Sequence, residues 1–350
     1  MKQALVAMSG GVDSCATAYL MVANGYDCIG ATMLLHTDKT NGCTSERDIQ
    51  DAAATCATLG IPHRVVELTD EFDRYVIKNF IEAYENGLTP NPCIECNLHL
   101  KFDKLLEYAR ENGYDYIATG HYARVEYDEK YGRCVLKRAL DLTKDQSYVL
   151  WRLSQEKLQR VIFPLGAVES KTKTREIAEK IGLDISRKKE SQDICFVPNG
   201  DYAKFIEDYT GKTYPPGDFV RFDGKYLGKH KGIIRYTIGQ RKGLGLALDR
   251  SMYVVEKDLL NNRIIIGDTE HLMKSELWAR DVCLSAVDTL DAPVRVKAKI
   301  RYNQRETDAT AVMENGLLHV TFDEPQRAIS KGQSVVLYDG DVVLGGGIIV

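Results

Sequence analysis

The chain has 350 residues, of which 44% are hydrophobic and 27% charged, and its formal net charge is −4. This composition is ordinary for a folded globular protein, and the length predicts two or three domains. No apolar stretch approaches the ~20 residues that a membrane-spanning helix needs, and the apolar run at residues 4–8 is too short for a signal-peptide core. We therefore expect a cytoplasmic protein without a membrane partner.

The first 200 residues alternate between strand and helix patterns. Apolar runs predict strands at residues 3–8, 28–35, 63–68 and 116–119. Helical spacing of apolar residues predicts helices at residues 14–24, 49–59, 71–86 and 101–112. Strands that alternate with helices form parallel sheets with helices on both faces. The sequence therefore predicts an α/β domain over residues 1–200.

The pattern changes near residue 200. A helix is predicted at 201–209, and short β-like runs with glycine-containing turns continue to about residue 270. Clearer strand patterns follow at residues 281–287, 294–302, 307–313, 317–322, 334–338 and 342–349. We predict a small central linking domain at 201–270 and a C-terminal β-barrel at 271–350.

A glycine-containing loop connects the first predicted strand to the first predicted helix. It reads Ser9-Gly10-Gly11-Val12-Asp13-Ser14. Adjacent glycines and a helix N-terminus can present backbone N–H groups to an anion, and Asp13 can either hold Mg²⁺ or cap the helix. The loop lacks the Gly-Lys-Ser/Thr ending of a Walker A motif, which argues against γ-phosphoryl transfer. An ordinary glycine turn is the alternative interpretation.

This string resembles the signature of the ATP-pyrophosphatase superfamily. Members of that superfamily release pyrophosphate and leave AMP on an oxygen of the substrate. An adenylated oxygen is a good leaving group, so a nucleophile can replace it. The loop alone does not identify the nucleophile.

Three of the nine cysteines are candidates for chemistry, namely Cys93, Cys96 and Cys195. An odd number of cysteines in a long chain without a secretion signal makes a structural disulfide framework unexpected. Three interpretations stay open: Cys96 and Cys195 form a catalytic pair that uses a persulfide, all three thiols ligate a metal or an iron–sulfur cluster, or they are inert core residues. Because Cys96 lies near a predicted helix N-terminus, we expect a lowered thiol pKa there.

The whole chain resembles the tRNA-specific 2-thiouridylases, which place sulfur at position 2 of the wobble uridine. The resemblance rests on motifs distributed along the chain: residues 7–14, Asn91-Pro92 with Cys96-Asn97, Lys101-Phe102, residues 118–123, residues 144–148, the loop around Cys195, residues 236–245, and Arg301-Tyr302.

The resemblance implies a fold, a reaction and a set of site residues. The fold would be an adenine nucleotide alpha-hydrolase-like domain followed by the central domain and the barrel. The reaction would adenylate O2 of uridine 34 and transfer sulfur from a persulfide, with Cys96 as nucleophile and Cys195 as persulfide carrier. ATP would be bound by Ala7, Met8, Ser9, Gly10, Gly11, Val12, Asp13, Ser14, Met33 and Gly120, and Mg²⁺ would accompany it. The tRNA would be contacted by Asn91, Pro92, Cys93, His121, Lys144, Asp145, Gln146, Arg301, Tyr302 and Gln333. Sulfur would come from a cysteine desulfurase or a sulfur-relay protein.

One residue departs from the family pattern, because many members have Asp where this chain has Cys93. A thiol can act as a base only when its pKa is suitable. The change therefore favours Cys93 as a ligand of an iron–sulfur cluster with Cys96 and Cys195, although the persulfide mechanism stays ahead. A synthetase with an amine nucleophile and an RNA-binding iron–sulfur sensor are the rival functions.

Overall fold

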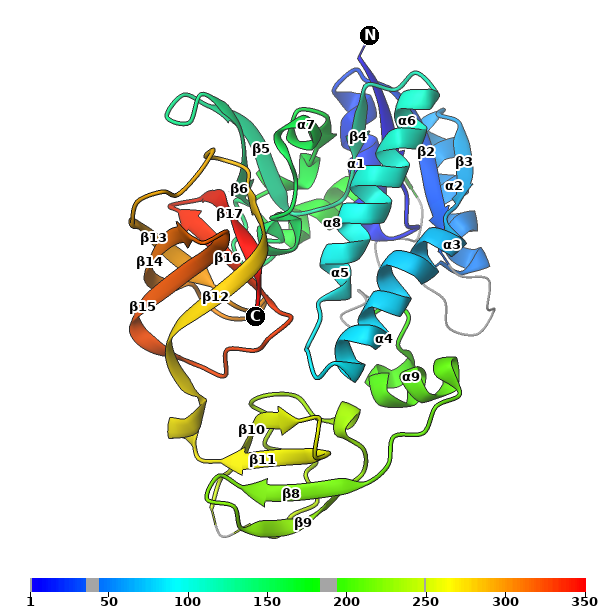
Figure 1. The fold of residues 1–350 in the computed structure, drawn as a ribbon. Coiled ribbons are helices and arrows are strands. Elements are labelled where there is room, and N and C mark those ends of the chain that lie inside the picture. The colour runs from blue at the N-terminus through cyan, green and yellow to red at the C-terminus, as the bar shows by residue number, and fades with distance from the viewer. Residues whose placement is uncertain (1, 36–43, 183–193, 249) are drawn as a thin grey trace.

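The computed structural model describes residues 2–35, 44–182, 194–248 and 250–350. The predicted fold class is confirmed, with a parallel-sheet α/β unit, a small central sheet and an antiparallel barrel. Figure 1 shows the helices of the α/β unit on the right, the barrel on the left and the central sheet below both.

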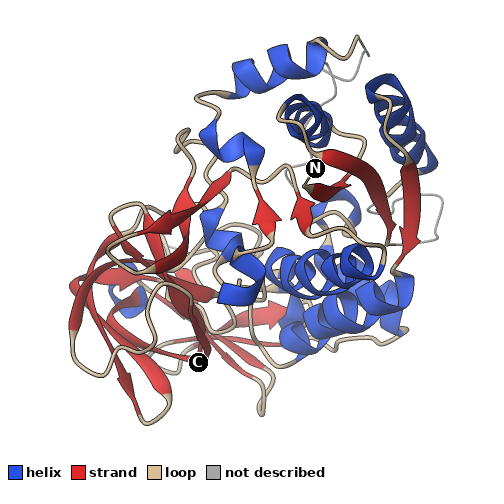
Figure 2. Cartoon of the chain, turned by 90° about the horizontal axis from the view of Figure 1, so that it is seen from above, coloured by secondary structure: helices blue, strands red, loops and turns tan. Residues whose placement is uncertain are grey.

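The α/β unit is built on a five-stranded sheet in the order β3-β2-β1-β4-β7. Its strands are parallel: β1 (Gln3–Ala7), β2 (Asp27–Leu34), β3 (His63–Glu67), β4 (Tyr116–Ala118) and β7 (Val161–Ile162). Neighbouring residues of β1 face opposite sides of the sheet. Leu5 packs in one core cluster and Val6 in another. Helices therefore cover both faces, as Figure 2 also shows.

Helices α1 (Val12–Ala23), α2 (Glu46–Leu59) and α8 (Lys171–Glu179) contribute to the cluster around Val6. The cluster around Leu5 includes two longer helical segments that each contain a π-helical stretch. The first is α3 (Thr69–Phe72), η1 (Asp73–Ile77) and α4 (Lys78–Glu85). The second is α5 (Pro92–Glu95), η2 (Cys96–Lys104) and α6 (Leu105–Glu111), and it starts earlier than predicted. Asn91 accepts the Cys93 N–H at 3.2 Å and Pro92 occupies the first helical position, so both favour a helix start there.

The central sheet has the order β10-β11-β8-β9. Its strands are β8 (Gly217–Arg221), β9 (Tyr226–His230), β10 (Tyr253–Asp258) and β11 (Arg263–Gly267), preceded by helix α9 (Tyr202–Thr210). Phe219, Ile264 and Ile266 are buried in its own core. Short helical segments connect elements elsewhere: η3 (Ser147–Leu150), α7 (Gln155–Leu158), η4 (Pro164–Ala167), η6 (Pro198–Gly200), η7 (Ile233–Arg235) and η8 (Thr269–Leu272).

The barrel closes because β12 pairs with both β15 and β17. Its strands are β12 (Met273–Leu284), β13 (Val294–Lys299), β14 (Thr307–Glu314), β15 (Leu317–Arg327), β16 (Ser334–Asp339) and β17 (Val342–Ile349). The strand predicted at 281–287 has the wrong start, because most of residues 273–280 are exposed and show little apolar pattern. A hairpin that was not predicted, β5 (Ala123–Asp128) and β6 (Arg133–Arg138), extends this sheet from β17.

Candidate active site

The loop after β1 lies at the carboxyl edge of the parallel sheet. The chain order reverses between β1 and β4, and ligands of open α/β sheets bind at such a switch point. Gly10 has φ +66°, and a Cβ there would lie 2.3 Å from the Asp48 carbonyl oxygen. Gly11 is the N-cap of α1. Gly10 is therefore required by this turn, whereas Gly11 has an extended backbone with room for a Cβ.

The two serines of the loop bond to each other within it. The Ser14 hydroxyl donates to the Gly11 carbonyl oxygen at 2.9 Å, and the Ser9 N–H and hydroxyl both donate to Ser14 Oγ, at 3.2 and 3.3 Å. These bonds give the loop a defined shape without a ligand. Of the other residues predicted to bind ATP, Ala7 and Met8 lead into the loop and Met33 lies near the end of the neighbouring β2.

Asp13 does not cap the helix. Its carboxylate accepts hydrogen bonds from Lys171 Nζ at 2.6 Å and from the Tyr122 hydroxyl at 2.8 Å, and the N-cap of α1 is Gly11, which makes no side-chain cap hydrogen bond. The capping interpretation is therefore wrong. A Mg²⁺ ion would compete with Lys171 for this carboxylate. A Mg²⁺ role for Asp13 stays a prediction.

The segment Thr119–Tyr122 follows β4 and joins the loop to the rest of the site. A Cβ on Gly120 would lie 3.0 Å from the Asp13 backbone carbonyl carbon, so the two segments touch. His121 is buried, with Nδ1 2.6 Å from Thr119 Oγ1 and Nε2 3.4 Å from Lys101 Nζ. Lysine only donates, so Nε2 accepts and Nδ1 carries the proton. Burial, helped by the Lys101 charge, holds the His121 pKa well below its usual value.

Cys93 and Cys96 are free thiols three residues apart in one helical segment. Cys93 is exposed and Cys96 is partly buried. Burial raises the pKa of Cys96, the Lys101 ammonium opposes that rise, and Cys93 adds to it. The surrounding protein atoms likewise raise the pKa of Cys93 against the charge of Lys101. The expectation of a lowered pKa for Cys96 is therefore wrong, because desolvation outweighs the nearby positive charge.

Lys101 was not among the predicted site residues, although it acts on Cys93, Cys96 and His121. In an α-helix, residues five apart lie on different faces. Here η2 is π-helical, and the Leu105 N–H donates to the Leu100 carbonyl oxygen, five residues back. A π-turn brings residues five apart nearly into line and is frequent at functional sites. Cys96 and Lys101 therefore come together for a reason that helical spacing alone conceals.

Cys195 is not joined to the other two candidate thiols. It is exposed and disulfide-bonded, whereas Cys93 and Cys96 are free. Its neighbour Phe196 packs edge-on against Phe72 and Phe80, beneath the helices of the α/β unit. Among the described residues, no group of three potential metal ligands is gathered. The iron–sulfur interpretation on Cys93, Cys96 and Cys195 stays a prediction, and the donor set does not fit a cluster in this arrangement.

Asp145 and Gln146 make hydrogen bonds next to the segment that contains His121 and Tyr122. Asp145 accepts hydrogen bonds from the backbone N–H groups of Ala139 and Ser147 and from the Ser147 hydroxyl. The Gln146 side chain accepts the Tyr122 N–H at 2.9 Å, and the Gln146 N–H donates to the Tyr122 carbonyl oxygen at 2.8 Å. Asp145 and Gln146 therefore stabilise the turn beside Tyr122. Their predicted contact with RNA, and that of Lys144, stays a prediction.

The barrel contributes residues to the same region. Burial raises the pKa of Tyr302, and the charges of Asp145 and Cys93 add to that rise. Lys299 Nζ lies 5.6 Å from the centre of the Tyr302 ring. Arg301 donates to the Ala328 carbonyl oxygen and to Ser330 Oγ, and Gln333 donates to the Thr89 carbonyl oxygen at 2.7 Å. Arg301 and Gln333 thus hold loops near Asn91 and Pro92.

Known proteins match this chain over nearly its full length. Three family models match, described as a tRNA methyl transferase HUP domain (residues 2–199), a tRNA methyl transferase PRC-barrel domain (203–268) and an aminomethyltransferase beta-barrel domain (274–349). The tRNA-specific 2-thiouridylase MnmA of Clostridioides difficile is 47% identical over 99% of this chain and 98% of its own length. The chain belongs to the tRNA-specific 2-thiouridylase family.

Other relatives agree with this assignment. The MnmA of Acetivibrio thermocellus is 47% identical over 99% of both chains. The MnmA 1 of Caldanaerobacter subterraneus subsp. tengcongensis is 48% identical over 99% of this chain and 97% of its own length. The expected enzyme class, a sulfurtransferase, is therefore confirmed at the level of the family. No helix among the described residues is both long and apolar enough to span a bilayer.

Proposed function

We propose that this protein is a tRNA-uridine 2-sulfurtransferase that uses ATP to thiolate the wobble uridine. The observation that carries the proposal is the continuity of one site. The segment Thr119–Tyr122 touches Asp13 of the glycine-containing loop and, through His121 and Lys101, reaches Cys96. A loop suited to pyrophosphate and a nucleophilic sulfur would thus act on the same bound nucleotide.

The proposed reaction has three bond-exchange steps. The uridine O2 attacks the α-phosphorus of ATP, and the bond to pyrophosphate breaks. The terminal sulfur of a persulfide on Cys195 then bonds to C2, and AMP leaves with the former O2. Finally the Cys96 thiolate attacks the Cys195 sulfur, which breaks the persulfide bond, leaves sulfur on C2 and forms a Cys96–Cys195 disulfide. A thiol reductant must reduce that disulfide before the next cycle.

The residues around the loop have defined parts in this scheme. Backbone N–H groups of Gly10 to Val12 at the start of α1 would stabilise the departing pyrophosphate charge. Lys101 would make the thiolate of Cys96 easier to form than burial alone allows, and Tyr302 would stack on the target base. Cys195 is disulfide-bonded in this structure, so it must be reduced before it can accept sulfur from a desulfurase or relay protein.

The test is a reaction with tRNA, ATP and a sulfur donor, followed by mass spectrometry of the nucleosides. We expect 2-thiouridine and one pyrophosphate per product, and we expect Cys96→Ser and Cys195→Ser to abolish the product. Pyrophosphate release that Cys96→Ser leaves intact, without 2-thiouridine as a product, would instead favour an adenylating synthetase with an amine nucleophile. Methylated uridine formed from S-adenosylmethionine would favour the methyl transfer that the family-model description names.

An iron and sulfide assay on anaerobically prepared protein addresses the alternative sulfur carrier. That alternative would use Cys93, a second free thiol on the helical segment that bears Cys96. Activity without iron would exclude the cluster. Loss of both iron and activity in Cys93→Ala would exclude the persulfide route as written.

A further inference from the structure

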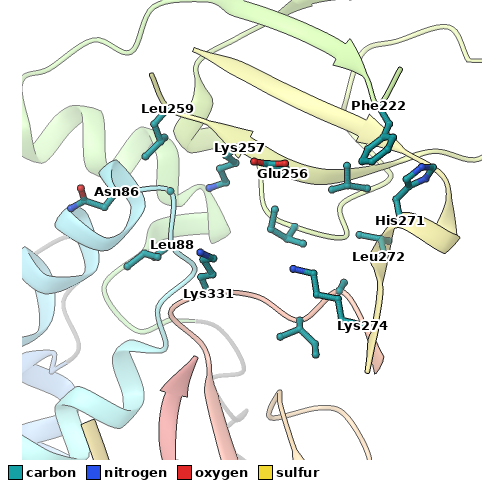
Figure 3. Close-up of a pocket in the computed structure, with 15 residues that line it drawn as sticks. Asn86, Leu88, Phe222, Glu256, Lys257, Leu259, His271, Leu272, Lys274 and Lys331 are labelled. Atoms are coloured by element: carbon teal, nitrogen blue, oxygen red, sulfur yellow. The ribbon is translucent and has the colours of Figure 1, made fainter. Parts of the chain in front are cut away.

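A cavity of about 550 Å³ lies where the α/β unit, the central sheet and the barrel meet. We call it the junction cavity. The α/β unit contributes Leu88 after α4, the central sheet contributes Phe222 and Lys257, and Lys274 and Lys331 come from the barrel. Figure 3 shows the amino groups of the three lysines turned into the same space. Nothing in the proposed reaction uses this cavity.

Lys257 is the least expected of these residues. Its Nζ is buried and has no hydrogen-bond acceptor among the described residues, and its contact is the Tyr84 ring, with the ring centre at 5.8 Å. Burying an ammonium without a partner is costly, so such groups are normally paired. The side chain therefore lacks the counterion that its position requires.

The other polar groups of the cavity are mostly donors. Lys274 and Lys331 are exposed, and Glu256 is the one acidic residue in the described lining. His271 Nδ1 accepts the Asp268 N–H at 3.2 Å, which leaves Nε2–H as a donor, and its ring packs against Phe222 with centres 4.0 Å apart. A cavity lined by three ammonium groups, one carboxylate and an aromatic side chain suits an anion that also carries a ring or a sugar.

We propose that the junction cavity binds the phosphate group of a nucleotide. Lysine ammonium groups act as point charges that suit phosphate oxygens, and Leu88 and Phe222 would contact the ribose or base. Two sources have this chemistry, the backbone of the RNA substrate and a free mononucleotide. The first source rests on the proposed function, whereas the second does not.

The cavity is connected to the candidate active site through its wall. The Lys331 carbonyl oxygen accepts the Thr89 N–H at 2.9 Å, and Gln333 donates to the Thr89 carbonyl oxygen. Thr89 lies two residues before Asn91, the N-cap of the helix that bears Cys93 and Cys96. A phosphate bound by Lys257 and Lys331 would therefore connect the central sheet and the barrel to the helical segment that bears Cys93 and Cys96.

Binding should also take up a proton. Burial lowers the pKa of Lys257 to about 8, and an anion beside it would raise that pKa again. Calorimetry in buffers of different ionisation enthalpy near pH 8.5 would detect this uptake. Lys257→Met should remove it, while Lys204→Met, which deletes an exposed lysine on α9, should leave it intact.

The decisive experiment measures the binding of inorganic phosphate, uridine 5′-monophosphate and tRNA at fixed ionic strength. We expect Lys257→Met to weaken phosphate or mononucleotide binding at least tenfold and Lys204→Met to change it less than twofold. Lys331→Met, at an exposed position, provides a second variant if Lys257→Met does not fold. Ser14→Ala separates this binding from binding at the glycine-containing loop.

The measurements with tRNA and with uridine monophosphate distinguish an RNA backbone from a free mononucleotide as the ligand. If the RNA backbone is the ligand, the slope of log affinity for tRNA against log salt falls by about one in Lys257→Met. If a mononucleotide is the ligand, tRNA binding is unchanged while uridine monophosphate binding is lost. Unchanged binding of all three probes in folded Lys257→Met and Lys331→Met would overturn the proposal. Absence of thiolation by the wild type would count against the proposed function alone.

Discussion

His99 should be a cation at neutral pH and should stabilise the helix that bears Cys96. Its Nε2 lies 3.4 Å from Glu95 and its Nδ1 lies 3.5 Å from Asp103, one turn to either side. Hydrogen bonds to Asp103 and then to Glu95 raise the pKa of His99 to about 9. The ring also stacks on Tyr75, with centres 4.6 Å apart. We predict that His99→Gln destabilises this part of the α/β unit.

The magnitude follows from linkage. A rise from 6.5 to about 9 corresponds to at most ~3.4 kcal/mol. Because 28% of the side chain is exposed and both contacts are long, we expect about 1–2 kcal/mol. The folded-state pKa lies above the unfolded value, so this contribution is fully present below pH 6.5. It is lost as the pH rises through about 9.

The assay combines an NMR titration of the His99 ring with urea denaturation of both proteins at pH 6 and pH 10. The wild type should titrate near pH 9, and the difference in unfolding free energy should shrink at pH 10. What remains there measures the packing of the ring on Tyr75. A titration midpoint at or below 6.5, or a difference that does not change with pH, would refute the electrostatic explanation.

Three further substitutions test other parts of the site. Gly10→Ala places a Cβ against the Asp48 carbonyl oxygen at a positive φ, so pyrophosphate release should fall at least tenfold, while Gly25→Ala, which has open space, should retain it. Lys101→Met should raise the pKa of the Cys96 thiol further, measured by the pH dependence of iodoacetamide labelling, and an unchanged profile would contradict the assigned role of Lys101. Cys93→Asp should keep thiolation if a persulfide is the carrier and should lose activity together with iron if a cluster is, because a carboxylate replaces one thiolate ligand.

The sequence was informative about the fold wherever each element has a buried face. Strands β1 and β2 read as apolar runs because both faces of the sheet are covered there, whereas the edge strand β3 is mostly exposed. The β5–β6 hairpin escaped prediction because most of its residues are only partly buried, and because it pairs with β17, which comes some 200 residues later. Such a pairing leaves no local signal.

The site could be predicted from the sequence where a short motif fixes the backbone conformation by itself. Gly10 is required by a turn, so a glycine pattern is visible in the sequence there. Lys101 was missed because a π-helical stretch, rather than α-helical spacing, sets its neighbours. Asp13 was misread as a cap because its partners, Lys171 and Tyr122, come from distant segments. The spacing of residues in the sequence does not predict which distant residues a polar side chain will contact.

The charge balance around Cys96 bears on how sulfur is held. The charge of Lys101 lowers the pKa of both thiols against the effect of burial. A negative Cys93 would raise the pKa of Cys96 and make a second thiolate harder to form. Burial still raises both pKa values, so two neighbouring thiolates are harder to form beside this one ammonium than a single thiolate is. One thiolate is what attack on a persulfide needs, whereas a cluster needs both thiolates and would have to supply the second positive charge itself. The protein's own charges thus oppose a pair of thiolates more strongly than a single thiolate.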